Sequence, residues 1–138
     1  MIASQVRDAD RDEFAALLTT AEQVMSGGLQ VSSHAWTGLI DDVPVCMFGV
    51  APVGFLLPEQ GRPWMVGTTQ LDDHAILFLR RCRGQVKVML DAYPYLINYV
   101  ATFNIKAIAW LQWLGFTVDF TPRLYGADVP FYRFELRR

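Results

Sequence analysis

The second half of this sequence holds few side chains that could transfer a proton. His74 stands in "QLDDHAIL", at the start of a long amphipathic segment, and Asn98 stands in the apolar run "YLINYVA". Histidine changes charge near neutral pH, which suits a general base. We therefore predict His74 and Asn98 as candidate catalytic residues. The alternative for His74 is an exposed residue in the first turn of a helix.

The elements that would position these residues can be predicted from apolar spacing. "YLINYVA" alternates and predicts a strand, with Asn98 facing opposite to Ile97 and Tyr99. "NIKAIAWLQWL" predicts a helix that Gly115 ends. Asn104 stands where this helix begins, and Asn is among the best residues at an N-cap. "FTVDF" and "VPFYRFEL" predict two final antiparallel strands.

A long helix is predicted upstream of these strands. In "DDHAILFLRRCRGQVKVMLDA", apolar residues recur on one side. Asp72 or Asp73 is predicted to cap this helix, and Pro94 lies just past its end. Gly84 in its interior costs about 1 kcal/mol against Ala. Close packing of Gly84 against a strand would account for that cost.

The N-terminal half predicts a strand, a helical region and a hairpin. "ASQVRDAD" indicates a short first strand, and "DRDEFAALLTTAEQVMSGG" indicates a helix stopped by Gly27 and Gly28. Two apolar runs flank Asp41 and Asp42, which is typical of a β-hairpin. "PWMVGT" predicts a further short strand. Strands and helices alternate in the second half, so we expect a single α/β domain over residues 1–138.

Composition excludes several classes of protein. With 138 residues and 52% hydrophobic residues, the chain is long and apolar enough to bury a core, so disorder is excluded. A net charge of -2 argues against nonspecific binding to nucleic acid or an anionic membrane. The sequence has no apolar run of 18 residues. Cys46 and Cys82 lack metal-ligand spacing and are expected to be buried thiols, so we expect a cytoplasmic protein without a metal.

The predicted order of elements, together with "NIKAIAWLQWLGF", resembles the GNAT superfamily of N-acetyltransferases. In that family the corresponding helix carries an Asn, then an Ala, and ends at Gly-Phe. Asn104, Ala107, Gly115 and Phe116 match this pattern. The resemblance implies a mixed, mostly antiparallel twisted sheet with a V-shaped splay between its fourth and fifth strands. It also implies helices on both faces of that sheet.

The resemblance implies acetyl-CoA as the cofactor. Met65, Val66, Gly67 and Thr68 would form the cofactor-binding strand and turn, whose backbone holds the pantetheine arm and the thioester. Asn104 would contact the CoA, or it would serve only as the N-cap. Asn98 would line the cleft, or it would satisfy exposed backbone groups where the two strands diverge.

This sequence also departs from the GNAT pattern. The stretch "GTTQLDDHA" stands where the family has a glycine-rich pyrophosphate loop, and Gly67 is its only glycine. Asp72 and Asp73 would repel a pyrophosphate there. Leu111 occupies the position of the family's proton-donating Tyr. One of Tyr93, Tyr95 and Tyr99 could take its place.

A narrower resemblance involves "AWTGLIDDVPVCMFGVAP", "GRPWMVGT" and "IAWLQWLGFTV". These segments look like small GNAT-like proteins of tailed bacteriophages and prophages, some described as internal virion protein A-like. This implies a phage-encoded acetyl-CoA-dependent N-acetyltransferase in the cytoplasm of a bacterial host. The alternative is a catalytically inactive GNAT-fold protein that binds a host or virion protein through apolar surfaces, with a homodimer as a further option.

Overall fold

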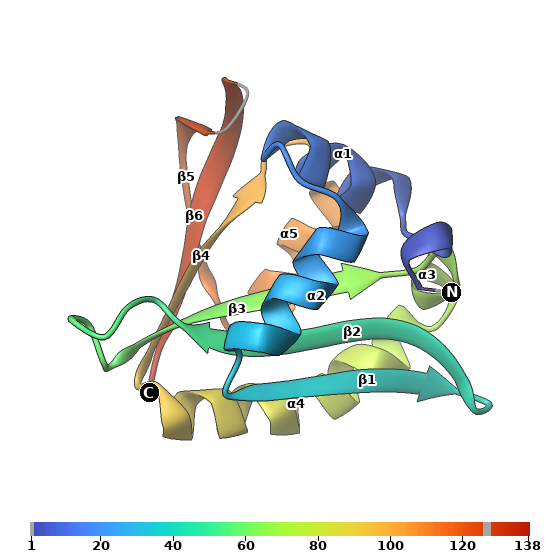
Figure 1. The fold of residues 1–138 in the computed structure, drawn as a ribbon, viewed down its shortest axis with the longest axis horizontal. Helices are drawn as coiled ribbons and strands as arrows, with labels where there is room; N and C mark the ends of the chain where they lie inside the picture. The colour runs from blue at the N-terminus through green and yellow to red at the C-terminus, as the bar shows by residue number, and fades with distance from the viewer. Residues whose placement is uncertain (1, 126–127) are drawn as a thin grey trace.

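The computed structural model describes residues 2–125 and 128–138. Its elements follow the chain from a short 3-10 helix to a C-terminal hairpin (Figure 1). They are η1 (Ala3–Gln5), α1 (Asp8–Ala16), α2 (Ala21–Val31), β1 (His34–Ile40), β2 (Val43–Pro52), β3 (Gln60–Gly67), α3 (Thr69–Asp73), α4 (Ala75–Ala92), β4 (Tyr95–Ala101), α5 (Ile105–Trp113), β5 (Thr117–Tyr125) and β6 (Val129–Arg137).

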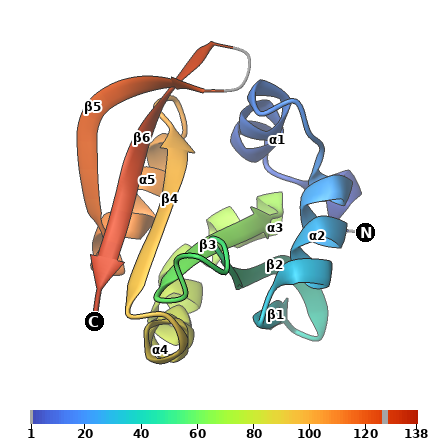
Figure 2. The same cartoon turned by 60° about the vertical axis from the view of Figure 1, so that its left-hand side comes forward.

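The strands form one sheet in the order β1-β2-β3-β4-β6-β5. All neighbours are antiparallel except β3 and β4. These two parallel strands pair only through Gln60 with Tyr95 and Gly61 with Leu96. Beyond that point they diverge toward their C-terminal ends (Figure 2). The predicted mixed, mostly antiparallel sheet is confirmed, and the splay lies between the two predicted strands, here β3 and β4.

Helices cover both faces of the sheet, which confirms a further expectation (Figures 1 and 2). The larger core cluster joins sheet residues such as Phe48 and Phe134 to Val86 of α4 and Ile108 of α5. On the other face, Val66 of β3 packs with residues of α1, α2 and the N-terminal segment. Residues on the two faces of β3 therefore contribute to different clusters, as the alternation of a strand requires.

The prediction of a first strand in "ASQVRDAD" is wrong. Ala3–Gln5 forms a 3-10 helix, and Val6 makes only an isolated bridge with Thr68. The Arg7 N–H donates to the Gly67 carbonyl at 2.9 Å. The end of β3 has diverged from β4, so the backbone N–H and C=O groups on that edge of β3 need other partners. The N-terminal segment supplies them.

The predicted helix over residues 10–26 is two helices. Thr20 caps the second, since its side chain accepts a hydrogen bond from the Gln23 N–H at 3.2 Å. Gly27 and Gly28 do not stop α2, which continues to Val31. A Cβ on Gly28 would lie 2.6 Å from the Trp64 ring, so this glycine allows α2 to approach β3 closely.

The β1–β2 hairpin is confirmed and the start of the long helix is corrected. Asp41 and Asp42 both have positive φ, 49° and 64°, as a two-residue hairpin turn of type I′ requires. The long helix α4 begins at Ala75, preceded by the short helix α3. Neither predicted aspartate caps α4, because both lie within α3.

Gly84 has no packing role, contrary to the expectation of a close contact. A Cβ added there would meet nothing within 4 Å. Gly84→Ala should therefore raise the free energy of unfolding by about 0.5–1 kcal/mol, by removing the entropic cost of a glycine within a helix. Urea denaturation measures this. Gly61→Ala is the contrasting control, since its Cβ would lie 2.7 Å from the Tyr93 ring and should destabilise the fold. Equal effects of the two substitutions would contradict this explanation.

Candidate functional site

A cavity of about 240 Å³ occupies the splay between β3 and β4. Its walls are mostly apolar and come from both faces of the sheet, including Met65 of β3, Trp110 and Leu111 of α5, and Phe14 of α1. The polar side chains that line it include Asp10, Glu13, Asn98, Tyr99 and Asn104. A mostly apolar pocket with a few converging polar groups is the usual form of a small-molecule site.

Both structural alternatives for Asn98 hold together, whereas its predicted catalytic role stays a prediction. Its Nδ2 donates to the Pro63 carbonyl across the splay at 2.7 Å, and its Oδ1 accepts from the Tyr99 N–H at 2.9 Å. Asn98 thus satisfies backbone groups that the diverging strands expose. It also lines the cavity.

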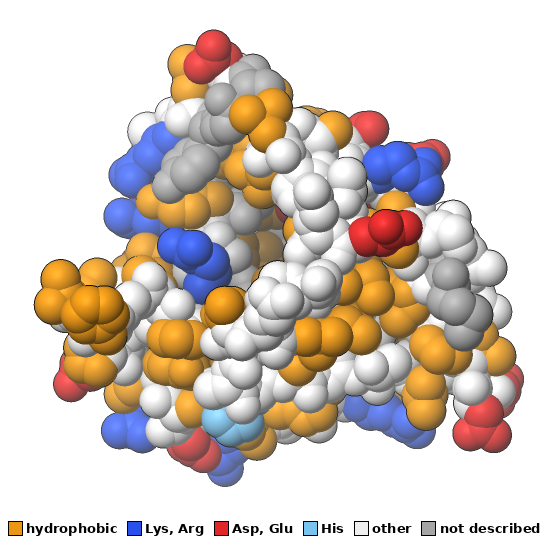
Figure 3. All heavy atoms as spheres, in the orientation of Figure 1, with side chains coloured by type: hydrophobic (Ala, Val, Ile, Leu, Met, Phe, Trp, Pro, Cys, Tyr) orange, Lys and Arg blue, Asp and Glu red, His pale blue; other side chains and the backbone are white. Residues whose placement is uncertain are grey.

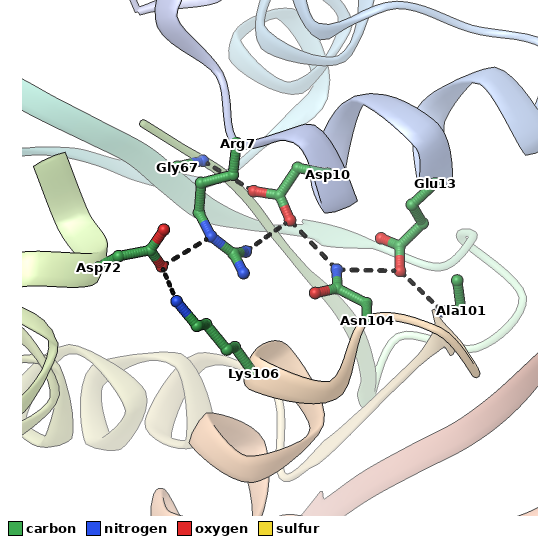
Figure 4. A network of polar contacts seen from close by, with 8 residues as sticks. All are labelled: Arg7, Asp10, Glu13, Gly67, Asp72, Ala101, Asn104 and Lys106. Atoms are coloured by element: carbon green, nitrogen blue, oxygen red, sulfur yellow. Dashed lines mark hydrogen bonds and ion pairs between the residues drawn. The ribbon is translucent and has the colours of Figure 1, made fainter. Parts of the chain in front are cut away.

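Asn104 is 1% exposed and stands at the N-cap position of α5, yet its side chain makes no capping hydrogen bond. Its Nδ2 donates to Asp10 Oδ1 at 3.1 Å and lies 3.5 Å from Glu13 Oε1 (Figure 4). The ionised Asp10 carboxylate can only accept, so its contact identifies the amide nitrogen of Asn104 as the atom that faces it. Asn104 Oδ1 is buried and has no partner among the described residues. A buried acceptor of this kind needs a donor.

Glu13 of α1 is a titratable group of the cavity wall whose pKa lies near neutral pH. Burial raises the pKa of this carboxyl to about 7, although the hydrogen bond from the Ala101 N–H, 2.6 Å from Oε1, opposes the rise. The nearby Asp10 carboxylate adds to the increase. A carboxyl with this pKa can exchange protons near neutral pH, as a general base does.

Sequence reasoning missed Glu13 because its partner Ala101 lies 88 residues away. The residue falls within the predicted first helix, among other charged residues that face water. Its position between Asp12 and Phe14, next to the apolar face of that helix, was the only local signal.

Arg7 lies at the end of β3, in contact with Asp10 and Trp110 of the cavity wall. Its guanidinium lies 2.9 Å from Asp10 Oδ1 and 3.1 Å from Asp72 Oδ1, and it stacks 4.6 Å from the Trp110 ring. Lys106 Nζ of α5 lies 3.5 Å from the same Asp72 oxygen (Figure 4). Arg7 is only 4% exposed, so the contacts of its own guanidinium are largely shielded from water.

The predicted cofactor-binding residues separate into two groups. Met65 and Asn104 line the cavity, whereas Val66, Gly67 and Thr68 are outside it. The Gly67 N–H donates to Asp10 Oδ2 at 3.2 Å, and the Thr68 hydroxyl donates to the Val45 carbonyl at 2.7 Å. Their predicted roles in binding a cofactor stay predictions.

The backbone of Met65 faces the splay. The Gly67 N–H and C=O point toward the splay, because they bond Asp10 and the Arg7 N–H. The Pro63 carbonyl also points there, because it accepts from Asn98 Nδ2. Alternate residues of a strand direct their N–H and C=O groups to the same edge. Met65 lies between those two residues at the same parity, so its N–H points into the gap where β4 no longer pairs with β3.

The structure does not bring His74 into the cavity. Its side chain is exposed, and its Nδ1 lies 3.3 Å from the Gln70 carbonyl. Two of the three candidate tyrosines are also engaged elsewhere, since the Tyr93 hydroxyl donates to Ser33 and the Tyr95 hydroxyl donates to Glu135. Tyr99 lines the cavity, as does Leu111.

Comparison with solved structures identifies the fold as that of the GNAT acetyltransferases. A GNAT-family acetyltransferase from Streptococcus pneumoniae is 14% identical, with 99% of this chain and 92% of that chain covered and a TM-score of 0.63. Ribosomal-protein-S5-alanine acetyltransferase from Vibrio fischeri is 12% identical over 86% of this chain and 68% of that one, with a TM-score of 0.63.

A third similar structure contains a ligand. The Campylobacter jejuni N-acetyltransferase PseH in complex with acetyl coenzyme A is 15% identical, with 85% of this chain and 77% of that chain covered and a TM-score of 0.55. No family model and no curated protein matches the sequence. Among the described residues, no helix is long and apolar enough to cross a membrane.

Proposed function

We propose that this protein is an N-acyltransferase that moves an acyl group from a thioester, such as acetyl-CoA, to an amine in the β3–β4 cavity. One observation carries this proposal: the Glu13 carboxyl, with a pKa of about 7, lines the same apolar cavity as Met65. An acyl transfer of this kind needs a proton acceptor and a hydrogen-bond donor for the carbonyl oxygen.

The residues of the cavity divide the reaction between them. The Met65 N–H donates to the thioester carbonyl oxygen, where negative charge develops. Glu13 accepts the proton that the amine loses as its lone pair forms the new C–N bond. The electron pair of the broken C–S bond leaves with the sulfur, and Glu13 returns the proton to that thiolate. Leu111 cannot supply a proton.

The site fits the acyl-pantetheine end of acetyl-CoA and does not fit its diphosphate end. The apolar cavity suits the acyl group and the pantetheine arm, and the unpartnered Asn104 Oδ1 would accept a hydrogen bond from an amide N–H of that arm. The segment after β3 carries Asp72 in α3 and lacks a second glycine, so it does not fit the diphosphate. No step of the proposed reaction involves that end.

The biological setting is proposed from the sequence resemblance of residues 35–52, 61–68 and 108–118. It supports a protein encoded by a bacteriophage or prophage that acts in the cytoplasm of the bacterial host. The acyl acceptor would then be a host protein or a small molecule.

The second candidate is a GNAT-fold protein that binds a host or virion protein without acyl transfer. The exposed apolar tip of the β2–β3 loop favours it, because Phe55 is 93% exposed and Leu56 is 83% exposed. This loop projects from the molecule as an apolar cluster at the left of Figure 3. A pull-down from bacterial lysate should recover a specific partner with the wild type and lose it with Phe55→Ser. No specific partner with the wild type, or one that Phe55→Ser retains, would contradict this candidate.

A thermal-shift titration with acetyl-CoA tests the proposed transferase. Ligand at one hundred times its dissociation constant should stabilise the native state by about 2.7 kcal/mol. Ala107→Phe, which fills the cavity, should abolish the shift. The matched variant Ala109→Phe, at an exposed position of the same helix, should retain it. No shift of the wild type at millimolar acetyl-CoA would overturn the proposal.

A further inference from the structure

The proposed reaction leaves unexplained the packed region at the end of β3, beside Gly67, which lies just outside the cavity. The cavity narrows at its other end, where Gln60 and Gly61 pair with β4. A donor whose carbonyl lies at Met65 and whose arm follows the splay therefore extends toward the C-terminal ends of β3 and β4. Arg7, Asp72 and Lys106 lie at that end (Figure 4).

The space beside Gly67 is filled by the protein itself. A Cβ on Gly67 would lie 2.9 Å from Leu71 Cδ2, 3.4 Å from Arg7 Cδ and 3.5 Å from Asp10 Oδ2. Its N–H and its carbonyl are both bonded, to Asp10 and to the Arg7 N–H. A glycine at a phosphate site lets the backbone approach the ligand, but here Leu71 and Arg7 occupy that position.

The charges at this end do not favour an anion. The two cations, Arg7 and Lys106, share Asp72, and Arg7 also pairs with the buried Asp10. A diphosphate would have to displace Asp72 from both cations or accept its carboxylate as a neighbour. Unlike Arg7, Lys106 is well exposed, so its attraction for a phosphate is weakened by water and salt.

We infer that the site recognises the acyl-pantetheine part of its donor and does not bind the nucleoside diphosphate of CoA. This inference rests on the proposed function, and it narrows the donor to acyl-pantetheine thioesters as a class. Carrier-protein-bound acyl-phosphopantetheine and free acyl-CoA share this chemistry. Both present the same arm to the cavity, and Asp72 discriminates against tight binding of the nucleotide end.

Titration of the full chain with two probes, acetyl-CoA and S-acetylpantetheine, tests the inference. Their dissociation constants should agree within about threefold, and adenosine 3′,5′-diphosphate should give no thermal shift. Acetyl-CoA bound tenfold more tightly, a difference of about 1.4 kcal/mol, would overturn this inference and leave the transferase proposal standing. Failure of both thioesters to bind would overturn both. An acetylated carrier protein as a third donor distinguishes the two sources of the arm.

A charge-removing pair of variants tests the role of Asp72. Asp72→Asn releases Arg7 and Lys106 toward the diphosphate, so the affinity for acetyl-CoA should rise by about tenfold and that for S-acetylpantetheine should not change. Asp73→Asn is the matched control, since this neighbour is exposed and no ion pair joins it to the described residues. An acetyl-CoA affinity that does not rise in Asp72→Asn would overturn the role assigned to this carboxylate.

Discussion

Glu13→Gln should lower the rate of acyl transfer by about 10²- to 10⁴-fold, because it removes the proton acceptor and keeps the shape of the side chain. Gln retains an oxygen that can accept from the Ala101 N–H, so the fold should persist. Asp12→Asn, at an exposed position of the same helix, is the matched control and should keep the wild-type rate. Steady-state kinetics with a saturating amine measure both. A Glu13→Gln variant with an unchanged rate would exclude Glu13 as the base.

The pH dependence provides a second readout of Glu13. The wild-type rate should rise as pH passes through about 7, since only the ionised carboxylate accepts a proton.

The free energy of unfolding should follow the opposite course and fall as pH rises. Because burial raises the pKa from 4.5 to about 7, the folded state holds this proton more tightly than the unfolded state. Its contribution to stability is fully present below pH 4.5 and is lost as pH rises through about 7.

The free energy of unfolding of Glu13→Gln minus that of the wild type should therefore be larger above pH 7 than at pH 4. The expected gain is on the order of 1–3 kcal/mol, reduced because the side chain is only half-buried. Asp10, whose pKa burial also raises, is present in both proteins, but its charge acts on Glu13, so the difference reports Glu13 together with its coupling to Asp10. Denaturation at several pH values gives this difference. A constant difference across pH would show that the carboxyl is not perturbed.

Arg7→Ala should have the largest effect on stability, with a loss of about 3–5 kcal/mol. The substitution leaves the buried Asp10 without its cationic partner and removes one of the two cations that contact Asp72. For a domain of this size the melting temperature should fall by roughly 10 °C or more. It also removes the cation stacked on Trp110.

The matched control for Arg7→Ala is Arg11→Ala, four residues further along the chain. Arg11 pairs with Asp8 at 3.1 Å, but both side chains are exposed, so the expected loss is below about 1 kcal/mol. Thermal denaturation at constant pH and ionic strength compares the two variants. Equal losses would show that Arg7 does not hold the N-terminal segment against β3.

The elements formed by local pattern could be predicted because their signals lie close together in the chain. Asp41 and Asp42 form the hairpin turn between adjacent apolar runs, and Gly115, with φ +104°, follows α5 where a left-handed residue is needed. The period of apolar residues was enough for the long helix α4, although its first turn was misplaced. Such signals depend on backbone preferences within a few residues.

The prediction for residues 3–10 failed because their conformation depends on a distant partner. A short segment with mixed polarity has no strong preference of its own. It lies beside Gly67 because the divergence of β3 from β4 leaves backbone groups that must be satisfied. The same packing places Arg7 against Asp72, 65 residues away.

The amino-acid pattern was sufficient for an α/β domain and for the elements that carry Met65, Asn98 and Asn104, and the resemblance to the GNAT superfamily added the mixed sheet and its splay. Tertiary packing was needed to place Glu13, the proposed base, in that cavity and to bring Arg7 against the end of β3. Asn104 meets Asp10 across 94 residues, and Ala101 meets Glu13 across 88. No local preference encodes such contacts. Burial then raises the pKa of Glu13, which is a property of the environment that the folded chain creates.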